Sequence, residues 1–97
     1  MKLKISHRVS EKLHAKHKVT VKELMECFEN RQGRDLFDTR AGHQTDPMTR
    51  WFLACTNHNR LLKVVFVPDV ANKDVEIKTA YEPNDEEIRI YKKYGLA

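Results

Sequence analysis

The stretch WFLACTNHNRLLKVVFVPDVANKDVEIKTAY, residues 51–81, decides the fold. Its apolar and β-branched residues form three runs typical of β-strands, at 51–56, 61–67 and 75–81. The polar links between these runs, at 57–59 and 68–74, contain Asn, Asp and Pro, which favour turns. The pattern therefore predicts an antiparallel meander in which each strand pairs with the next one along the chain.

Patterns outside the meander predict two shorter strands and three helices. The strands are expected at 3–5, where Leu and Ile alternate with Lys, and at 36–39. An exposed helix is expected at about 6–16, where two apolar residues stand four apart among charged ones. Two pairs have the spacing of a capping box, which begins a helix: Thr20 with Glu23, and Asn84 with Glu87.

The ends of the last two helices follow from residue type. The helix that begins at Thr20 is expected to end between 30 and 33, because Asn and Gly accept the left-handed conformation that closes a helix. The final helix is expected to end at Gly95. Its inner face is expected to consist of Ile88, Tyr91 and Tyr94.

Size and composition predict one α+β domain over residues 1–97. It comprises a short N-terminal strand, two helices, an antiparallel meander sheet of mainly three to four strands and a C-terminal helix. Residues 40–49 have no periodic pattern and are expected to form a mobile loop.

Cys27 and Cys55 stand in apolar stretches, as free thiols do. No apolar run approaches the roughly 20 residues that span a bilayer, so we expect a cytoplasmic protein without membrane contact.

Five histidines raise the question of a metal site. His14 and His17 stand one helical turn apart, but Lys12, Lys16 and Lys18 surround them and would repel a cation. The chain also has no glycine-rich phosphate loop, no Gly-x-Ser-x-Gly and no Cys-x-x-Cys. The sequence therefore predicts neither a bound metal nor a cofactor.

Basic residues interrupt the predicted strands at Arg50, Lys63 and Lys78. Because the apolar neighbours of Lys63 and Lys78 alternate toward the core, these lysines are expected on the outer face of the sheet. With a net charge of +4, such a face is suited to holding a phosphodiester while a Tyr or His moves a proton. The simpler interpretation is that these residues are only the solvated faces of strands.

Short motifs along nearly the whole chain resemble the BrnT family. They are KHKVT at 16–20, CFEN at 27–30, GR at 33–34, RLLKVVFV at 60–67, IKTAYE at 77–82 and EIRIY at 87–91. Members of that family are small toxins of type II toxin-antitoxin pairs, with a RelE-like fold and ribonuclease activity. The resemblance implies RNA as substrate, an antitoxin protein as partner and cleavage without a metal.

Together, the resemblance and the basic strands nominate two sets of site residues. The candidates for proton transfer are His17, Tyr81 and Tyr91, and the candidates for RNA binding are Arg50, Lys63, Lys78 and Arg89.

Two alternatives remain open. Tyr81 and Glu82 stand where the BrnT family carries basic residues, which favours a non-catalytic module that binds an antitoxin-like protein or a second copy of itself. The stretch KTAYEPN at 78–84 also resembles small proteins catalogued as ADP-ribosyl-(dinitrogen reductase) hydrolases. That second resemblance implies a small enzyme acting on a nucleotide-like substrate.

Overall fold

A computed structural model describes residues 1–39 and 48–96. The elements, in chain order, are β1 (Leu3–Lys4), α1 (His7–Lys12), η1 (Leu13–His17), α2 (Val21–Asn30), β2 (Leu36–Phe37), β3 (Arg50–Cys55), β4 (Leu61–Asp69), β5 (Asp74–Tyr81) and α3 (Asp85–Tyr94). Here η1 is a π-helical turn that continues α1. The expected α+β class and the order of elements are confirmed. The loop expected at 40–49 lies mostly outside the described residues.

The five strands form one sheet in the order β1-β5-β4-β3-β2. Strands β3, β4 and β5 pair antiparallel with their sequence neighbours, which confirms the meander. The sheet is nevertheless mixed, because β1 pairs parallel with β5 at one edge, Leu3 lying opposite Val75. At the other edge β2 adds only two residues to β3. Both edge strands are therefore much shorter than the three central ones.

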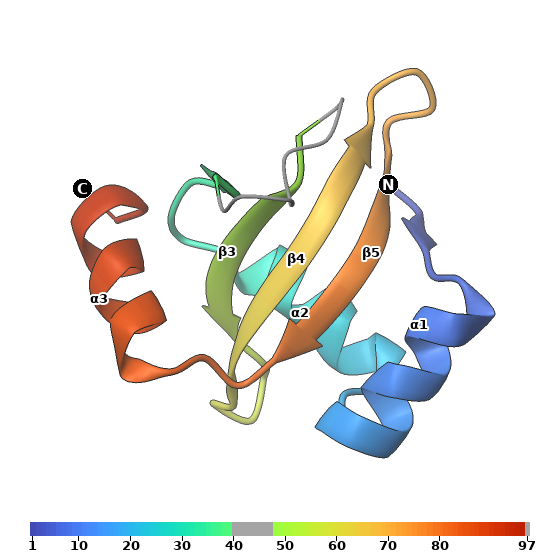
Figure 1. Ribbon diagram of the computed structural model, residues 1–97, viewed down its shortest axis with the longest axis horizontal. Helices are drawn as coiled ribbons and strands as arrows, with labels where there is room; N and C mark the ends of the chain where they lie inside the picture. The colour runs from blue at the N-terminus through green and yellow to red at the C-terminus, as the bar shows by residue number, and fades with distance from the viewer. Residues whose placement is uncertain (40–47, 97) are drawn as a thin grey trace.

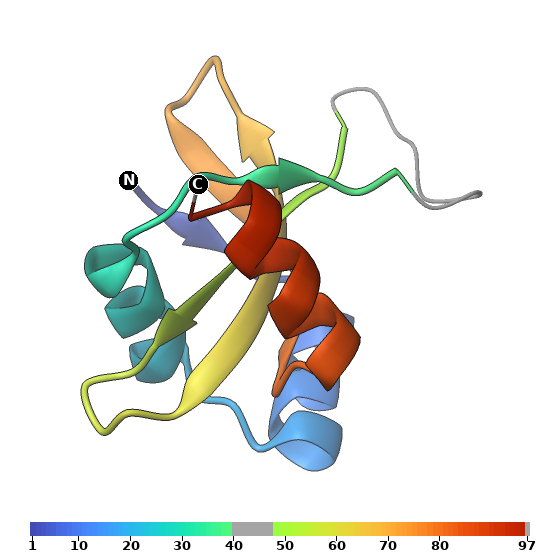
Figure 2. The ribbon, with the colours of Figure 1, turned by 90° about the vertical axis from the view of Figure 1, so that its left-hand side faces the viewer.

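Helices α2 and α3 cover opposite faces of this sheet (Figures 1 and 2). The Phe28 ring of α2 lies 4.9 Å from the ring of Phe52 on β3. The neighbouring residue on β3, Trp51, instead contacts Tyr91 of α3, with ring centroids 5.7 Å apart. Because successive strand residues point to opposite faces, the two helices must lie on different sides. Helix α1 and η1 pack beside β5 (Figure 1).

The core lies mainly between α2 and the sheet. Its largest fully buried side chains are Leu24, Cys27, Phe52, Leu62, Val64 and Ile77. Burial of one large apolar side chain contributes about 1.5–3 kcal/mol to folding, so this layer holds the fold together. Cys27 and Cys55 are both free thiols, as expected. Burial raises the pKa of Cys27 to about 12, which keeps that thiol protonated and unreactive.

Both expected capping boxes are present. The Glu23 amide donates to Thr20 Oγ1 over 3.1 Å, and the Thr20 amide donates to Glu23 Oε1 over 3.0 Å. The same reciprocal pair joins Asn84 and Glu87 at the start of α3. These bonds satisfy amides that the first helical turn leaves unpaired.

Two expectations about the helices are wrong. After α2 the chain does not turn left-handed, because Arg31 at the helix end is extended, with φ −61° and ψ 129°. Tyr94 does not face the sheet either: it is 54% exposed, whereas Ile88 packs against the core and Tyr91 is buried. Tyr94 lies on the last turn of α3, which reaches past the central strands toward β2 (Figure 2). Across the described parts of the chain, no helix combines the length and apolar character needed to cross a bilayer.

Candidate functional site

The structure brings together two of the expected proton-transfer residues, His17 and Tyr81. Their rings lie 5.6 Å apart, tilted by 35°. His17 ends η1 and Tyr81 ends β5. Leu13, four residues before His17, is buried in the core and fixes the face of the helix that meets β5. The pair thus forms where the end of η1 meets the end of the central sheet.

The turn after η1 has a special backbone. The Val19 amide donates to the Leu13 carbonyl over 2.9 Å, and Lys18 adopts a left-handed φ of 56°. A π-helical turn is rare and is found frequently at functional sites. Here the widened turn orients the His17 ring toward Tyr81.

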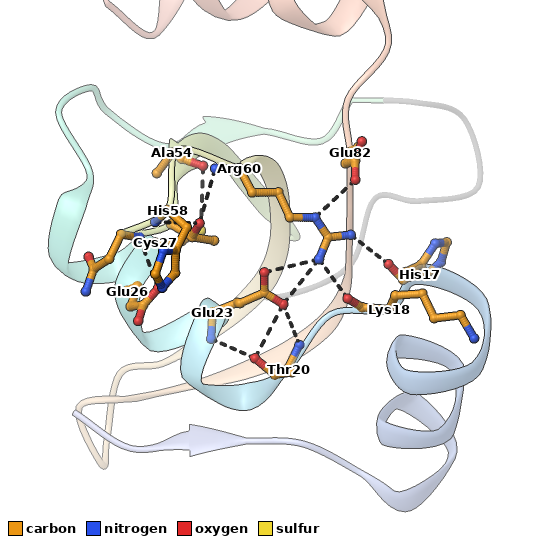
Figure 3. Close-up of polar contacts among 12 residues, drawn as sticks. His17, Lys18, Thr20, Glu23, Glu26, Cys27, Ala54, His58, Arg60 and Glu82 are labelled. Carbon is orange, nitrogen blue, oxygen red and sulfur yellow. Dashed lines mark hydrogen bonds and ion pairs between the residues drawn. The ribbon is translucent and has the colours of Figure 1, made fainter.

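The guanidinium of Arg60 anchors this turn to the sheet (Figure 3). Its Nη2 donates to the His17 carbonyl over 2.9 Å and its Nη1 donates to the Lys18 carbonyl over 2.7 Å. The same group forms ion pairs with Glu23 at 3.1 Å and Glu82 at 3.0 Å. Although burial raises the pKa of Glu23, hydrogen bonds from Thr20 and Arg60 lower it overall, so the pair stays charged. Arg60 therefore holds His17 in place.

Local sequence pattern does not reveal the role of Arg60. Its partners come from three separate segments, and only the fold brings them together. Glu82, which departs from the BrnT pattern, is one of those partners. Its carboxylate is therefore paired with Arg60, which it shares with Glu23.

Glu87 forms a second charged centre, next to Tyr81. Its Oε2 accepts a hydrogen bond from the Tyr81 hydroxyl at 2.8 Å and lies 2.6 Å from Lys63 Nζ. The Lys63 ammonium also lies 4.5 Å from the centre of the Trp51 ring. Burial raises the pKa of Glu87, but hydrogen bonds from Lys63, the Asn84 amide and Tyr81 lower it overall. The carboxylate is consequently ionised at neutral pH.

The expected basic outer face of the sheet is not present. Lys63 does point away from the α2 side, as expected, but α3 covers that face. Its side chain is only 6% exposed and is paired with Glu87. Alternation along a strand predicts which face a residue is on, but not what covers that face. Lys63 is therefore not an open phosphate contact.

The other expected RNA-binding residues are also engaged. Lys78 is exposed and lies 2.9 Å from Glu76. Arg89 pairs with Glu86 on the outer surface of α3. Arg50 stacks on Phe37, 5.1 Å from the ring centre. These residues do not converge with Lys63 into one basic surface, since each is held by a different local partner.

Tyr91 is a core residue. It is 2% exposed, and its hydroxyl donates to the Arg34 carbonyl over 2.9 Å. Burial raises its pKa, which makes it a poor proton-transfer group. Gly33 and Gly95 allow this close packing: a Cβ on Gly33 would come within 2.6 Å of the Tyr91 hydroxyl.

Exposed positive charge gathers instead at the N-terminal end of the chain. The first 22 residues contain seven Lys and Arg but one acidic residue, whereas the rest contain 11 basic and 13 acidic ones. Arg8, Lys12 and Lys16 follow one another at four-residue spacing along α1 and η1, and all three are exposed. Within the described chain, none of the three lies within ion-pair distance of a carboxylate. We call these three residues the basic row.

The basic row ends beside His17 and acts on it. Burial lowers the pKa of His17, and the charges of Lys16 and Lys12 lower it further. The imidazole is therefore neutral at pH 7 and able to accept a proton. The charge asymmetry behind this row can be counted from the sequence, but the lack of ion-pair partners cannot.

Among residues 1–39 and 48–96, no three His, Cys, Asp or Glu side chains lie close enough together to hold a metal ion.

Comparison of the chain with protein-family models, curated proteins and solved structures gave no match. The BrnT resemblance and the RelE-like fold therefore stay predictions that rest on the sequence motifs.

Proposed function

We propose that this chain is an RNA-binding protein of the toxin class that cleaves RNA without a metal, with His17 as its proton-transfer residue. One observation carries the proposal: a neutral, partly buried histidine lies at the end of an exposed basic row and against Tyr81. In this proposal the protein acts on RNA in the cytoplasm and is held in check by an antitoxin protein.

The chemistry follows from the state of His17. The neutral imidazole takes the proton from a ribose 2′-hydroxyl, and the oxygen attacks the adjacent phosphorus to give a 2′,3′-cyclic phosphate. The bond from phosphorus to the 5′-oxygen breaks, and the imidazolium returns the proton to that leaving oxygen. Lys12 and Lys16, whose charges already act on His17, stabilise the negative charge that develops on the phosphate oxygens.

Tyr81 takes a different part from the one expected. Its hydroxyl proton is directed to Glu87, so it is not aimed at a leaving group. We therefore assign it as a positioning residue, whose ring supports the imidazole of His17. Tyr91 is assigned a structural role because it is buried.

Induced expression in a bacterial host tests the proposal, with growth and the integrity of total RNA as readouts. We expect the parent to arrest growth and degrade RNA, and His17→Gln to relieve both effects. The matched control is His14→Gln, because His14 is exposed on the same helical segment. Normal growth with intact RNA, in cells that contain folded parent protein, would contradict the proposed activity.

A second candidate, the protein-binding module, is favoured by the edge of β3. Strand β2 pairs only with Arg50 and Trp51, so the rest of this edge has no strand beside it in the described chain. A groove of about 700 Å³ follows that edge between the end of α2 and α3, with Leu53, Cys55 and Leu96 among its lining residues. An uncovered strand edge is a template for an extended segment of another protein.

Copurification from the source cells tests this second candidate. A small partner should be retained by the parent and lost with Leu96→Glu, which places a charge in the groove. The control is Val70→Glu at the β4–β5 turn, where Val70 is 78% exposed. A parent chain that purifies alone and monomeric would count against the module.

A further inference from the structure

The ion pair of Lys63 and Glu87 is buried but has no part in the proposed proton transfer. The two side chains are 6% and 15% exposed, and their charged atoms lie 2.6 Å apart. A buried ion pair is weak evidence for stability, because the cost of removing two charges from water offsets their attraction. A pair of this kind in a cleft is a candidate for ligand recognition.

Such a cleft lies beside the pair. It has a volume of about 530 Å³ and runs between β2 and the later turns of α3, which pass close to each other (Figure 2). Its apolar lining includes Leu36, Trp51, Ile90 and Tyr94, and its charged lining consists of Asp38, Lys63 and Glu87. A volume in the range of roughly 300–1,000 Å³, with an apolar lining and a few polar groups, is typical of small-ligand sites.

We propose that this cleft binds one unpaired nucleobase of the RNA, with guanine bound most tightly. The inference rests on the proposed RNA-binding function and adds a specificity site to it. Tyr94, which is 54% exposed, offers the ring on which a base can stack. The Lys93 ammonium lies 5.3 Å from the centre of the same ring and supplies positive charge for the attached phosphate.

The selection of guanine follows from the hydrogen-bonding capacity of the pair. Lys63 carries three N–H donors, of which one is directed to Glu87. Glu87 is nearly saturated, because Oε2 accepts from Lys63 and Tyr81 and Oε1 accepts from Asn84. Lys63 therefore offers donors to a ligand, and guanine presents two acceptors, O6 and N7, on one edge. Adenine replaces O6 with an amino donor that would face Lys63.

The cleft is also connected to His17. Glu87 Oε2 bonds to Lys63 on the cleft side and to Tyr81 on the other, and the Tyr81 ring contacts His17. A base held at Lys63 thus lies at the end of a short chain of contacts that begins at the proposed proton-transfer residue. The arrangement would select the nucleotide beside the bond that is cleaved.

Fluorescence of Trp51 reports on this cleft directly, because it is the single Trp of the chain and lines the site. The purified protein is titrated with GMP, AMP and ribose 5-phosphate. The measured Trp51 fluorescence is corrected for light absorbed by the nucleotide. We expect a saturable change with GMP, binding of AMP weaker by about tenfold or more, and no change with ribose 5-phosphate, which lacks the base.

Variants at Tyr94 show whether stacking is involved. Tyr94→Leu keeps an apolar side chain without an aromatic face and should weaken GMP binding by about tenfold or more, whereas Tyr94→Phe should keep it. The matched control is Val70→Ala, which truncates an exposed apolar side chain on the β4–β5 turn, outside the cleft lining. Since Tyr94 is half exposed, these variants are expected to fold.

Absence of any GMP response, or a response that Tyr94→Leu leaves unchanged, would overturn the site. Equal binding of GMP and AMP would overturn the recognition by Lys63. A parallel titration with a single-stranded RNA oligonucleotide distinguishes failure of the nucleobase site from failure of the proposed RNA-binding function. If the RNA binds through the basic row while GMP gives no response, the nucleobase site fails and the proposed function stands; if neither binds, both fail.

Discussion

Lys63 is positioned by Trp51 and Tyr81, whose rings lie 4.5 and 5.6 Å from its ammonium, as well as by Glu87. We predict that Lys63→Met destabilises the protein by about 3 kcal/mol, because it leaves the Glu87 carboxylate buried without its cation. Chemical denaturation measures this change. Adding Glu87→Gln should recover most of the loss, since the buried charge is then removed.

The exposed pair of Lys78 and Glu76 is the control for that experiment. Both side chains are about half exposed, so Lys78→Met should cost about 1 kcal/mol or less. Equal losses from Lys63→Met and Lys78→Met would mean that the buried pair has no special environment.

His17 makes a prediction about pH at the same scale. Its pKa is lowered in the folded protein, so below about pH 6.5 the unfolded chain binds a proton that the folded chain does not. Stability should therefore fall as the pH drops from about 6.5 through the lowered pKa of the folded state. Carboxylates such as Glu23 and Glu87, whose pKa is also lowered, contribute a further loss only below about pH 4.5.

The comparison of variants isolates the histidine. Thermal unfolding of His17→Gln should vary less with pH than that of the parent between about pH 5 and 6.5. His14→Gln is the matched control, because His14 lies exposed on the same helical segment. Identical profiles for the parent and His17→Gln would contradict the lowered pKa.

Among the elements, η1 is held by a single distant side chain, that of Arg60. Arg60 is 26% exposed and donates to two carbonyls at the end of η1. Arg60→Lys should cost about 2 kcal/mol, because an ammonium cannot reproduce the planar fork of a guanidinium. Amide hydrogen exchange should then quicken at 13–20, where the turn has lost its anchor.

Arg89→Lys is the matched control for Arg60, since Arg89 pairs on the surface of α3 with a side chain 62% exposed. It should change stability by less than about 1 kcal/mol and leave exchange at 13–20 as in the parent. If Arg60→Lys behaves in the same way, the turn is held by something other than this guanidinium.

Elements differ in how far their sequence predicts them. Both capping boxes and the three central strands are correct because they depend on residues close together in the chain. Helix α2 ends at Asn30, within the expected range, but the expected left-handed closure is wrong, since Arg31 is extended. The parallel pairing of β1 is not expected either, because it joins residues about 70 positions apart. Local sequence pattern thus predicts where helices and strands form better than it predicts which of them pair.

At the scale of the whole molecule, the same limit applies to the candidate site. The BrnT resemblance nominates His17 and Tyr81, and the fold brings their rings together. The expected RNA-binding residues were chosen by strand alternation, which does not show that α3 covers Lys63. The basic row is recognised only from the structure, because it is defined by basic side chains that have no carboxylate within ion-pair distance. The distribution of charge, rather than the sheet face, therefore defines the surface that we assign to RNA.

We expect the basic row beside His17 to bind RNA. The decisive measurement is the binding of a single-stranded RNA oligonucleotide by the purified chain across a range of salt concentrations. The test variant replaces Arg8, Lys12 and Lys16 by Gln, and the control makes the same change in charge at Lys73, Lys78 and Lys92, which are also exposed.

We predict that the test variant binds RNA more weakly and reduces the salt slope by about 2, because each phosphate contact contributes about 0.7 to that slope. The control should keep nearly the affinity and slope of the parent. If the two variants weaken binding equally, the net charge of the protein, and not the position of the basic row, determines RNA binding. If the parent does not bind RNA, the proposed function is contradicted.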